Sequence, residues 1–392
     1  MDGGRWQSGR MRVVLALDKF KGTLTASEVT ERARRGVLRV LPDADVLPVA
    51  VADGGDGTID ALVAAGFEVV PVRVAGPTGR PVTARIARLG AVAAVELADC
   101  CGLVRLGGAL APWDAGTRGL GEAIHAAIGL AGVHEVVVGI GGSASTDGGA
   151  GLLAALGVRL LDADGEPVPP GARGLTSLAR VDVSGLDPRL SGPDAVRLTV
   201  ASDVDAPLLG PRGAASVFGP QKGLGAGDIP VVDAALARLA DLVEPLLRPA
   251  RELPGAGAAG GTGWALLALG AALRPGVSLV LGLAGFDALV AGADLVITGE
   301  GSLDAQTLTG KTPVGVARAA SGVPCVAVCG RLELTPDQLH AAGIAAALPL
   351  TDLAAEPADA VRRAGPLVED AVAQLVARFL LGPAAYAGDD RG

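Results

Sequence analysis

Several features are scarce in this sequence, and each scarcity argues against a class of protein. No apolar run among the 392 residues reaches the roughly 20 residues that span a bilayer. The first ten residues, MDGGRWQSGR, lack the apolar stretch of a signal peptide, so we expect a cytoplasmic protein without a membrane segment. The four cysteines have neither zinc-ligand nor secreted-disulfide spacing, and we expect buried or incidental thiols.

Positive charge is also scarce. The formal net charge is −9, and no cluster of basic residues offers a surface for a phosphate backbone, which argues against nucleic acid as a partner. Only four of the 33 basic residues are lysine, and all four lie in the glycine-containing segments DKFKG, GPQKG and TGKT, as Lys19, Lys21, Lys222 and Lys311. A lysine ammonium is a compact point charge on a flexible stem, which suits contact with a phosphate group that moves. We therefore expect small-molecule chemistry at these loops.

The remaining composition favours a layered α/β protein with two domains. Half of the residues are apolar, only 2% are aromatic, and 59 are glycine. A chain of this length exceeds the size at which one hydrophobic core stops growing. We expect an α/β fold with two domains: a parallel-sheet domain and an inserted second α/β domain with a mixed sheet.

The order of the predicted elements sets the expected domain boundaries. RVVLALD from residue 12, ADLVITGEG and VPCVAVCG are continuous apolar strands of the kind found in a parallel sheet. Thr25 and Glu28 form a capping box before a helix that ends near Pro42. Residues 69–97 alternate like antiparallel strands, and the apolar run from Trp264 to Leu273, which follows the loop PGAGAAGGTG, is expected to form a helix. We therefore assign residues 11–75 and 285–382 to the first domain and 76–284 to the insertion, with a disordered extension at 1–10 and a flexible tail at 383–392.

Acidic residues recur where the predicted strands end. Asp18 follows the first strand, Asp53 and Asp56 the second, Asp147 a third, Asp203 and Asp205 a fourth, and Glu300 with Asp304 a fifth. Asp and Gly favour turns, which accounts for any one of these loops taken alone. Ligands of open α/β sheets bind outside the carboxyl ends of the strands, so five such ends with lysines between them favour one converging site. Phosphoryl transfer needs this combination of carboxylates and cations. The three histidines lie away from the glycine-rich loops, and we expect them to be structural.

LTGKTPVG is the best single signal for an anion site. Thr312 can cap a helix whose first residue is Pro313, which places free N–H groups beside Lys311. The segment is not a P-loop, because the position that requires glycine is Ala305.

Two further loops admit more than one interpretation. GIGGSASTDGG fits a dinucleotide fingerprint through Gly139, Gly141 and Ala144, so an NAD(P)-dependent oxidoreductase is the alternative function. Asp203 and Asp205 face the same way if their strand continues through them, and could then hold Mg²⁺, although a turn before Pro207 explains them equally well. Lys222 follows a Gly-Pro turn, where it could be merely solvated.

The whole set of motifs resembles the type-1 glycerate kinases. The resemblance rests on DKFKG, VADGGDGT, GIGGSASTDGGAG, DVDAPLLGPRGAASVFGPQKG, PGAGAAGGTGWAL and GEGSLDAQTLTGKTPVGVA, which run in order from about Met11 to about Gly330. Lys19 stands where serine is usual, Thr146 where asparagine is usual, and Ala206 where asparagine is common. The resemblance implies a two-domain α/β structure whose parallel-sheet domain is flavodoxin- or Rossmann-like. It also implies a kinase of organic-acid catabolism that uses ATP and Mg²⁺ to convert D-glycerate to 2- or 3-phosphoglycerate. It indicates no oligomeric state.

Residue roles follow as hypotheses. We expect the seven carboxylates Asp18, Asp53, Asp147, Asp203, Asp205, Glu300 and Asp304 to ring a cleft between the domains. Asp147 is the first choice for the base, Asp203 and Asp205 are the preferred Mg²⁺ carboxylates, and either Lys21 or backbone N–H groups meet the glycerate carboxylate. The catalytic set is Asp18, Lys21, Asp147 and Lys222. The substrate and phosphate set is Lys21, Asp53, Gly54, Gly55, Gly141, Gly142, Ser143, Lys222, Glu300, Asp304, Lys311 and Thr312.

Overall fold

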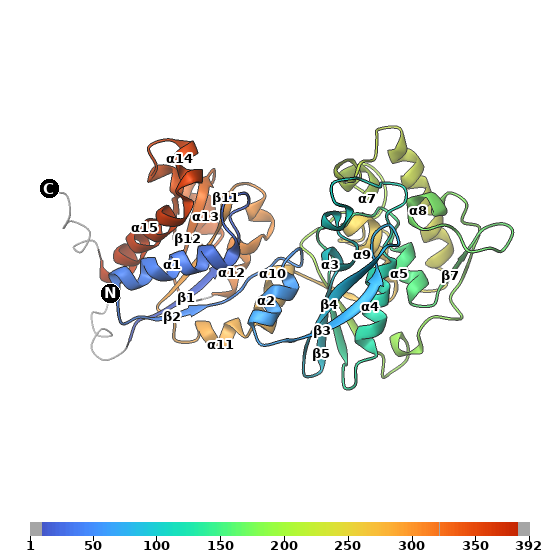
Figure 1. Ribbon diagram of the computed structural model, residues 1–392, viewed down its shortest axis with the longest axis horizontal. Coiled ribbons are helices and arrows are strands. Elements are labelled where there is room, and N and C mark those ends of the chain that lie inside the picture. Colours follow the sequence, from blue (N-terminus) through green and yellow to red (C-terminus); the bar gives the residue numbers. More distant parts are fainter. Residues whose placement is uncertain (1–9, 321, 383–392) are drawn as a thin grey trace. The chain divides into compact units, whose positions relative to one another are not determined.

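A computed structural model describes residues 10–320 and 322–382, and its contacts divide the chain into two units, Met1–Ala52 with Val277–Gly392 and Asp53–Gly276. We call these unit 1 and unit 2 (Figure 1). The predicted boundaries at residues 76 and 285 differ from these. The strand Glu68–Ala75, expected in the first domain, pairs with a strand of unit 2. The predicted extension and tail lie outside the described residues, apart from Arg10.

Unit 1 is built on a five-stranded parallel sheet. Its strand order is β13-β12-β11-β1-β2, which is the flavodoxin order interrupted in sequence by unit 2. The strands are β1 (Arg12–Leu17), β2 (Asp45–Pro48), β11 (Leu295–Leu303), β12 (Cys325–Leu332) and β13 (Ala346–Pro349). The predicted continuous apolar strands are confirmed as β1, β11 and β12. The switch point of this order lies between β1 and β11, where Asp18 directly follows β1 and Glu300 lies in the last part of β11.

Helices cover both faces of this sheet. One core cluster joins β1 to α1 and α15, and a second joins β1 to α10, α11, α12 and α13. The helices are α1 (Ala26–Val40), α10 (Gly276–Leu283), α11 (Phe286–Val290), α12 (Thr312–Ala319), α13 (Pro336–Ala341), α14 (Pro357–Arg362) and α15 (Ala364–Val376). The predicted capping box of α1 is confirmed: Thr25 accepts from the backbone of Glu28, and Glu28 accepts from the backbone of Thr25.

Unit 2 contains the mixed sheet that the sequence predicted. The order is β10-β9-β6-β5-β4-β3, antiparallel from β3 to β5 and parallel from β5 to β10. These strands are β3 (Glu68–Ala75), β4 (Pro81–Leu89), β5 (Val92–Glu96), β6 (Glu135–Gly139), β9 (Arg197–Ala201) and β10 (Ala272–Arg274). A separate hairpin pairs β7 (Arg159–Leu161) with β8 (Arg180–Asp182).

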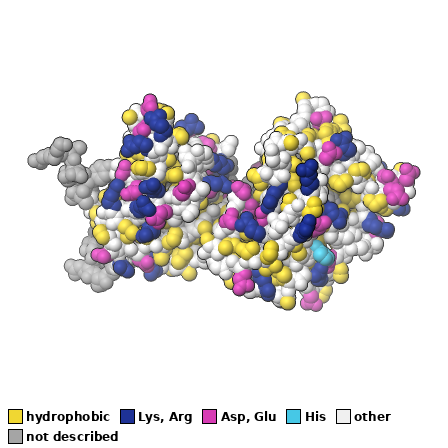
Figure 2. Space-filling model, viewed as in Figure 1, with side chains coloured by type: hydrophobic (Ala, Val, Ile, Leu, Met, Phe, Trp, Pro, Cys, Tyr) yellow, Lys and Arg dark blue, Asp and Glu magenta, His cyan; other side chains and the backbone are white. Residues whose placement is uncertain are grey.

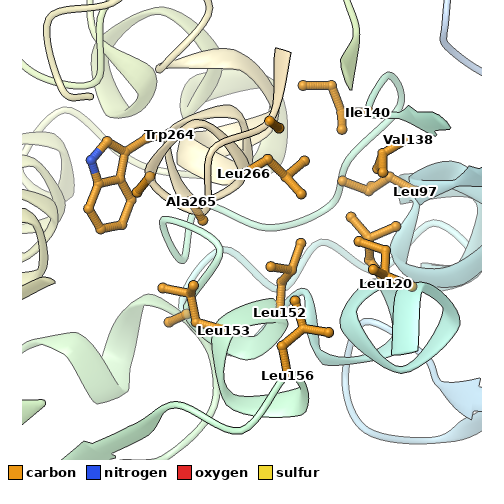
Figure 3. Packing of buried hydrophobic residues seen from close by; sticks show 14 of the residues in the cluster. Leu97, Leu120, Val138, Ile140, Leu152, Leu153, Leu156, Trp264, Ala265 and Leu266 are labelled. Carbon is orange, nitrogen blue, oxygen red and sulfur yellow. The ribbon is translucent and has the colours of Figure 1, made fainter. Parts of the chain in front are cut away.

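The core of unit 2 lies between this sheet and its helices. Figure 3 shows Leu97, Leu120, Leu152 and Leu266, from four different helices, among the side chains that fill it. The helices are α2 (Thr58–Ala64), α3 (Leu97–Cys101), α4 (Arg118–Ile128), α5 (Ala150–Ala155), α6 (Gly171–Leu175), α7 (Ala214–Phe218), α8 (Asp228–Val243) and α9 (Thr262–Ala268).

Two expectations about local structure have clear outcomes. The helix expected over residues 264–273 ends at Ala268, because Gly270 takes a left-handed φ of 94° and releases Ala272–Arg274 to form the edge strand β10. The four cysteines are free and buried, as expected. No helix of the described residues is both long and apolar enough to cross a membrane.

Candidate functional site

The carboxyl ends of three neighbouring parallel strands in unit 2 lie level with one another. Glu96 of β5 pairs with Gly139 of β6, and Gly139 pairs with Ala201 of β9. The glycine-rich loops that follow these strands, together with the segment that begins at Asp53, therefore meet at one edge of the sheet. This is the edge at which open α/β sheets bind their ligands.

The Asp53–Gly57 segment packs backbone against backbone on this edge. The Gly141 N–H donates to the Gly54 carbonyl over 3.2 Å. A Cβ on Gly54, whose φ is +85°, would lie 2.4 Å from the Ala201 carbonyl oxygen, and one on Gly141 would lie 2.4 Å from the Gly55 Cα. Side chains at these positions would push the loops apart, so glycine is required for this close approach. The predicted substrate loops at Gly54, Gly55 and Gly141 are thus brought together.

A cavity of about 290 Å³ opens beside these loops, entirely within unit 2. Its polar wall is formed by Gly141, Gly142, Ser143 and Lys222, and Leu103, Ile140, Val204 and Phe218 supply apolar surface. A mostly apolar cavity with a few convergent polar groups is typical of a small-molecule site.

Lys222 is the main charged group of this cavity. Its side chain is only 2% exposed, and its Nζ donates to the Ser143 hydroxyl and to the Ser145 carbonyl, each over 2.6 Å. Burial lowers the pKa of Lys222 to about 7, although the negative charge of Asp147 opposes this shift. Lys222 is therefore held inside the protein and is not the solvated turn residue that the sequence also allowed.

The backbone of the glycine-rich segment Ala258–Gly261 is strained next to Lys222. Ala259 has φ 55° and ψ 37°, and it is the single non-glycine residue with positive φ in the described chain. Ala259 lines the cavity, and a Cβ on the following Gly260 would lie 2.9 Å from the Lys222 Nζ. Strained backbone of this kind clusters at functional sites.

Asp147 has a different environment from the one expected for a base. Its carboxylate is fully buried and accepts hydrogen bonds from four donors: the Thr117 N–H (2.9 Å), the Thr117 hydroxyl (2.8 Å), the Gly149 N–H (3.2 Å) and the Gly151 N–H (3.1 Å). These bonds join the loop after β6 to the start of α4 and α5. A carboxylate that is engaged in this way is suited to holding a loop rather than to taking a proton from a substrate.

Asp203 is a partly buried acidic residue in the loop that follows β9. It accepts from the Gly276 N–H over 3.2 Å, and burial raises its pKa to about 6, with the negative charge of Asp53 adding to the shift. Strand β9 ends at Ala201, so the condition under which Asp203 and Asp205 would face the same way is not met. Asp205 is exposed. The carboxylate whose negative charge helps to raise the pKa of Asp203 is that of Asp53.

The carboxylates of unit 2 can be compared with what Mg²⁺ requires of its ligands. The described residues contain no group of three or more His, Cys, Asp or Glu side chains arranged to hold a metal ion. Mg²⁺ in phosphoryl-transfer sites needs less than this, since it is held by one or two carboxylates, with waters and substrate phosphates completing its shell. Asp203, whose raised pKa owes part of its shift to the negative charge of Asp53, and Asp53 itself are two carboxylates that fit such an ion.

Unit 1 has its own polar cluster, at the carboxyl ends of β1 and β11. The Thr312 hydroxyl donates to Asp18 over 3.2 Å, and the Thr307 hydroxyl donates to Glu300 over 2.6 Å. Asp304 accepts from the Gln306 N–H over 2.8 Å, and Lys311 Nζ donates to the Gln306 side chain over 3.1 Å. Burial raises the pKa of Glu300, as do the charges of Asp18 and Asp304, whereas Lys311 opposes the shift.

The predicted cap of the helix after Lys311 needs a correction. The N-cap of α12 is Lys311 and its first residue is Thr312, one position earlier than predicted. Thr312 therefore uses its hydroxyl to bind Asp18 instead of capping the helix. Lys21 is exposed on the loop after β1, close to the backbone of Gly301.

The dinucleotide interpretation of the Gly139 loop is not supported by the local geometry. In such a fingerprint the helix opens directly at the glycines, whereas α5 begins only at Ala150. Asp162 stands about 20 residues beyond the glycines, where such a fingerprint has its ribose-binding acidic residue, but it accepts from the Asp164 and Glu166 N–H groups of its own turn.

Sequence reasoning missed Glu96 of unit 2. Its side chain is 2% exposed, and burial raises its pKa to about 7. An acidic residue directly after the apolar run AVAAV was the available signal, and it was hidden because that run was interpreted only as part of an antiparallel segment.

Comparisons with known proteins agree with one another. The model of the glycerate kinase family matches residues 13–380. Glycerate kinase of Bacillus subtilis (strain 168) is 43% identical over 95% of this chain and 98% of its own, and glycerate 2-kinase of Escherichia coli (strain K12) is 40% identical over 85% and 89%. A crystal structure of a candidate glycerate kinase 2 from Salmonella typhimurium LT2 superposes with a TM-score of 0.80 at 40% identity, covering 94% of this chain and 98% of that one.

Proposed function

The chain belongs to the glycerate kinase family, and we propose that it transfers the terminal phosphoryl group of ATP to a hydroxyl of D-glycerate, giving 2- or 3-phosphoglycerate. The observation that carries this proposal beyond family membership is the buried Lys222 in the wall of a glycine-loop cavity. Phosphoryl transfer depends mainly on positioning and on electrostatic stabilisation of the transferred group, and Lys222 with the Gly141–Ser143 loop can supply both.

Lys222 is suited to respond to the phosphate. With a pKa near 7 and no carboxylate in direct contact in the described structure, it is poised between its neutral and charged forms. An incoming phosphate places negative charge beside the amine and favours the protonated form. Lys222 then stabilises charge on the transferred group as a cation inside a site of low dielectric.

The roles of the carboxylates are also proposals. We propose that Asp203 and Asp53, with Asp205 beside them, hold Mg²⁺, which neutralises phosphate charge when it is bound. We propose that Asp147 fixes the loop that carries Ser143 and does not act as the base, because all of its bonds go to the loop and to the starts of α4 and α5.

Unit 1 contributes a second set of groups to the proposal. Lys21, Lys311 and Thr312, with Asp18, Glu300 and Asp304, lie at the switch point of a flavodoxin-type sheet, where such sheets bind ligands. We propose that they contact substrate carboxylate or phosphate. The type-1 assignment within the family and a cytoplasmic location remain part of the same proposal.

A coupled assay of ADP formation tests the function. We expect ADP to form only when ATP, Mg²⁺ and D-glycerate are all present, and phosphorus NMR to identify the phosphorylated hydroxyl. Reduction of NAD(P)⁺ by glycerate without ADP formation would instead support an oxidoreductase, and binding of glycerate without turnover would support a sensor.

A further inference from the structure

Glu96 lies at the end of β5 and belongs to no site assigned above. We propose that Glu96 is a positioning residue of the phosphoryl-transfer site, whose carboxylate holds the Asp53–Gly57 loop against the carboxyl ends of β6 and β9. This inference rests on the proposed function, because it assigns a task within that site.

Two hydrogen bonds tie Glu96 to the loop. One carboxylate oxygen accepts from the Gly57 N–H over 3.2 Å, and the other accepts from the Ile59 N–H over 3.0 Å. Between these two donors, the Thr58 hydroxyl donates to the Gly55 carbonyl over 2.7 Å, which closes the turn. The chain from Gly55 to Ile59 is therefore fixed to the end of β5 through one side chain.

The other side of the same loop is fixed by backbone contact. Gly54 accepts from the Gly141 N–H, and Gly54 lies so close to Ala201 that a Cβ would meet its carbonyl oxygen at 2.4 Å. Glu96 and these contacts hold the loop from two directions. Because Asp53 precedes this pair of anchors directly, the anchors decide where its carboxylate stands relative to Asp203.

The geometry calls for an ionised carboxylate. Both oxygens accept backbone N–H groups, whereas an amide of the same shape has one acceptor oxygen and would turn an N–H₂ group toward the second donor. A glutamine at position 96 would leave one buried N–H of the loop unpaired, which loosens the loop.

Burial, hydrogen bonds and charged neighbours together set the pKa of Glu96. Burial raises its pKa to about 7, the charges of Asp56 and Asp99 add to the rise, and its two backbone hydrogen bonds oppose it. Asp99, on α3, is itself paired with Arg85 of β4 and Arg105. Above pH 7 Glu96 is ionised and accepts both bonds, and below pH 7 it gains a proton and the hold on the loop weakens.

The test uses the full-length chain with Glu96→Gln and Glu122→Gln as its matched control. Glu122 is also a unit 2 carboxylate that accepts a backbone N–H, from Ala75 over 2.7 Å, and it lies outside the proposed site. Amide hydrogen exchange of residues 53–59 and kcat/KM for glycerate are measured from pH 6 to pH 9, together with the melting temperature.

We expect Glu96→Gln to lower kcat/KM at pH 8 by about ten- to hundredfold, the size of one lost charge-assisted hydrogen bond. Exchange at Gly57 and Ile59 should accelerate by a similar factor, and the melting temperature at pH 8 should not fall. The ratio of wild-type to Glu96→Gln activity should rise as the pH rises through about 7. Asp203 and Lys222 also have shifted pKa values, but because both residues are present in both proteins their titration cancels in this ratio. Glu122→Gln should match the wild type in exchange at residues 53–59 and in activity.

Three outcomes overturn the inference. One is unchanged exchange at residues 53–59 in Glu96→Gln, whatever happens to activity. Another is a parallel fall in melting temperature and activity with a ratio that is flat with pH, which would make Glu96 merely structural. The third is an equal loss in Glu122→Gln. If the wild-type chain forms no ADP with glycerate, the proposed function fails by itself, and the exchange measurement still decides whether Glu96 holds the loop.

Discussion

Replacing Lys222 with methionine should make the protein more stable near neutral pH while it abolishes activity. Methionine is similar in length, carries no charge and packs well in irregular apolar space. Lys222 is 2% exposed and is surrounded by the Ser143 hydroxyl, the Ser145 carbonyl and the Gly260 backbone. The substitution therefore removes a buried charge without creating a large cavity.

The direction of the effect follows from the pKa of Lys222, which falls from 10.5 to about 7 in the folded protein. Between these values the unfolded chain binds a proton that the folded chain lacks, so stability rises with pH across this window. Below pH 7 the full cost of burying the charge is present, about 5 kcal/mol. Loss of the hydrogen bond to the buried Ser145 carbonyl offsets about 1–3 kcal/mol of this. We expect Lys222→Met to gain about 2–4 kcal/mol at pH 6.5, and to lose that gain by pH 10.

Urea unfolding at the two pH values measures this difference. Intrinsic tryptophan fluorescence is a suitable signal, because Trp113 and Trp264 both belong to unit 2. Lys21→Met is the matched control: it removes the same charge from an exposed loop, and its unfolding free energy should stay within about 0.5 kcal/mol of the wild type. A Lys222→Met protein that is less stable than the wild type at pH 6.5, or whose difference does not change with pH, would refute the reasoning.

The remaining predictions concern the carboxylates of unit 2. Asp147→Asn should lower the free energy of unfolding by about 3–5 kcal/mol, because its buried donors lose a charged acceptor. Urea denaturation measures this change. Unchanged stability with abolished activity would return Asp147 to the role of base. Asp203→Asn should raise the Mg²⁺ concentration for half-maximal activity by about tenfold. In the wild type that concentration should climb as the pH falls through about 6, because Asp203 then takes up a proton that competes with the ion; an unchanged Mg²⁺ requirement in the variant would exclude Asp203 as a ligand.

The sequence predicted best those elements whose local signals agree with their tertiary context. The capping box at Thr25 and the continuous apolar strands β1, β11 and β12 were identified because a cap and a doubly covered strand are local patterns. The helix expected to reach Leu273 was too long, because apolar residues on either side of Gly270 continue the same pattern although the chain turns there.

The candidate site shows where such prediction stops. Position along the chain identified Lys222 and Asp147, but burial decides what they do, and neither the enclosure of Lys222 nor the four donors around Asp147 can be inferred from neighbouring residues. Two of these four donors belong to Thr117, thirty positions away. Glu96 was missed for the same reason, since its partners at Gly57 and Ile59 lie far from it in sequence.

Some relatives that this chain matches are named for the 2-position of glycerate and others are not, so the product remains to be measured. Basic and acidic side chains are interspersed on the face of the molecule shown in Figure 2, in keeping with a small-molecule enzyme.

The most direct test of the central claim compares wild-type and Lys222→Met protein in one assay of ADP formation with ATP, Mg²⁺ and D-glycerate. Removing a preorganised charge from a phosphoryl-transfer site costs about 10²–10³ in kcat by analogy with other electrostatic stabilisers. We predict glycerate-dependent ADP formation by the wild type and a loss of at least this size in the folded variant. Turnover by Lys222→Met within a few fold of the wild type would contradict the account.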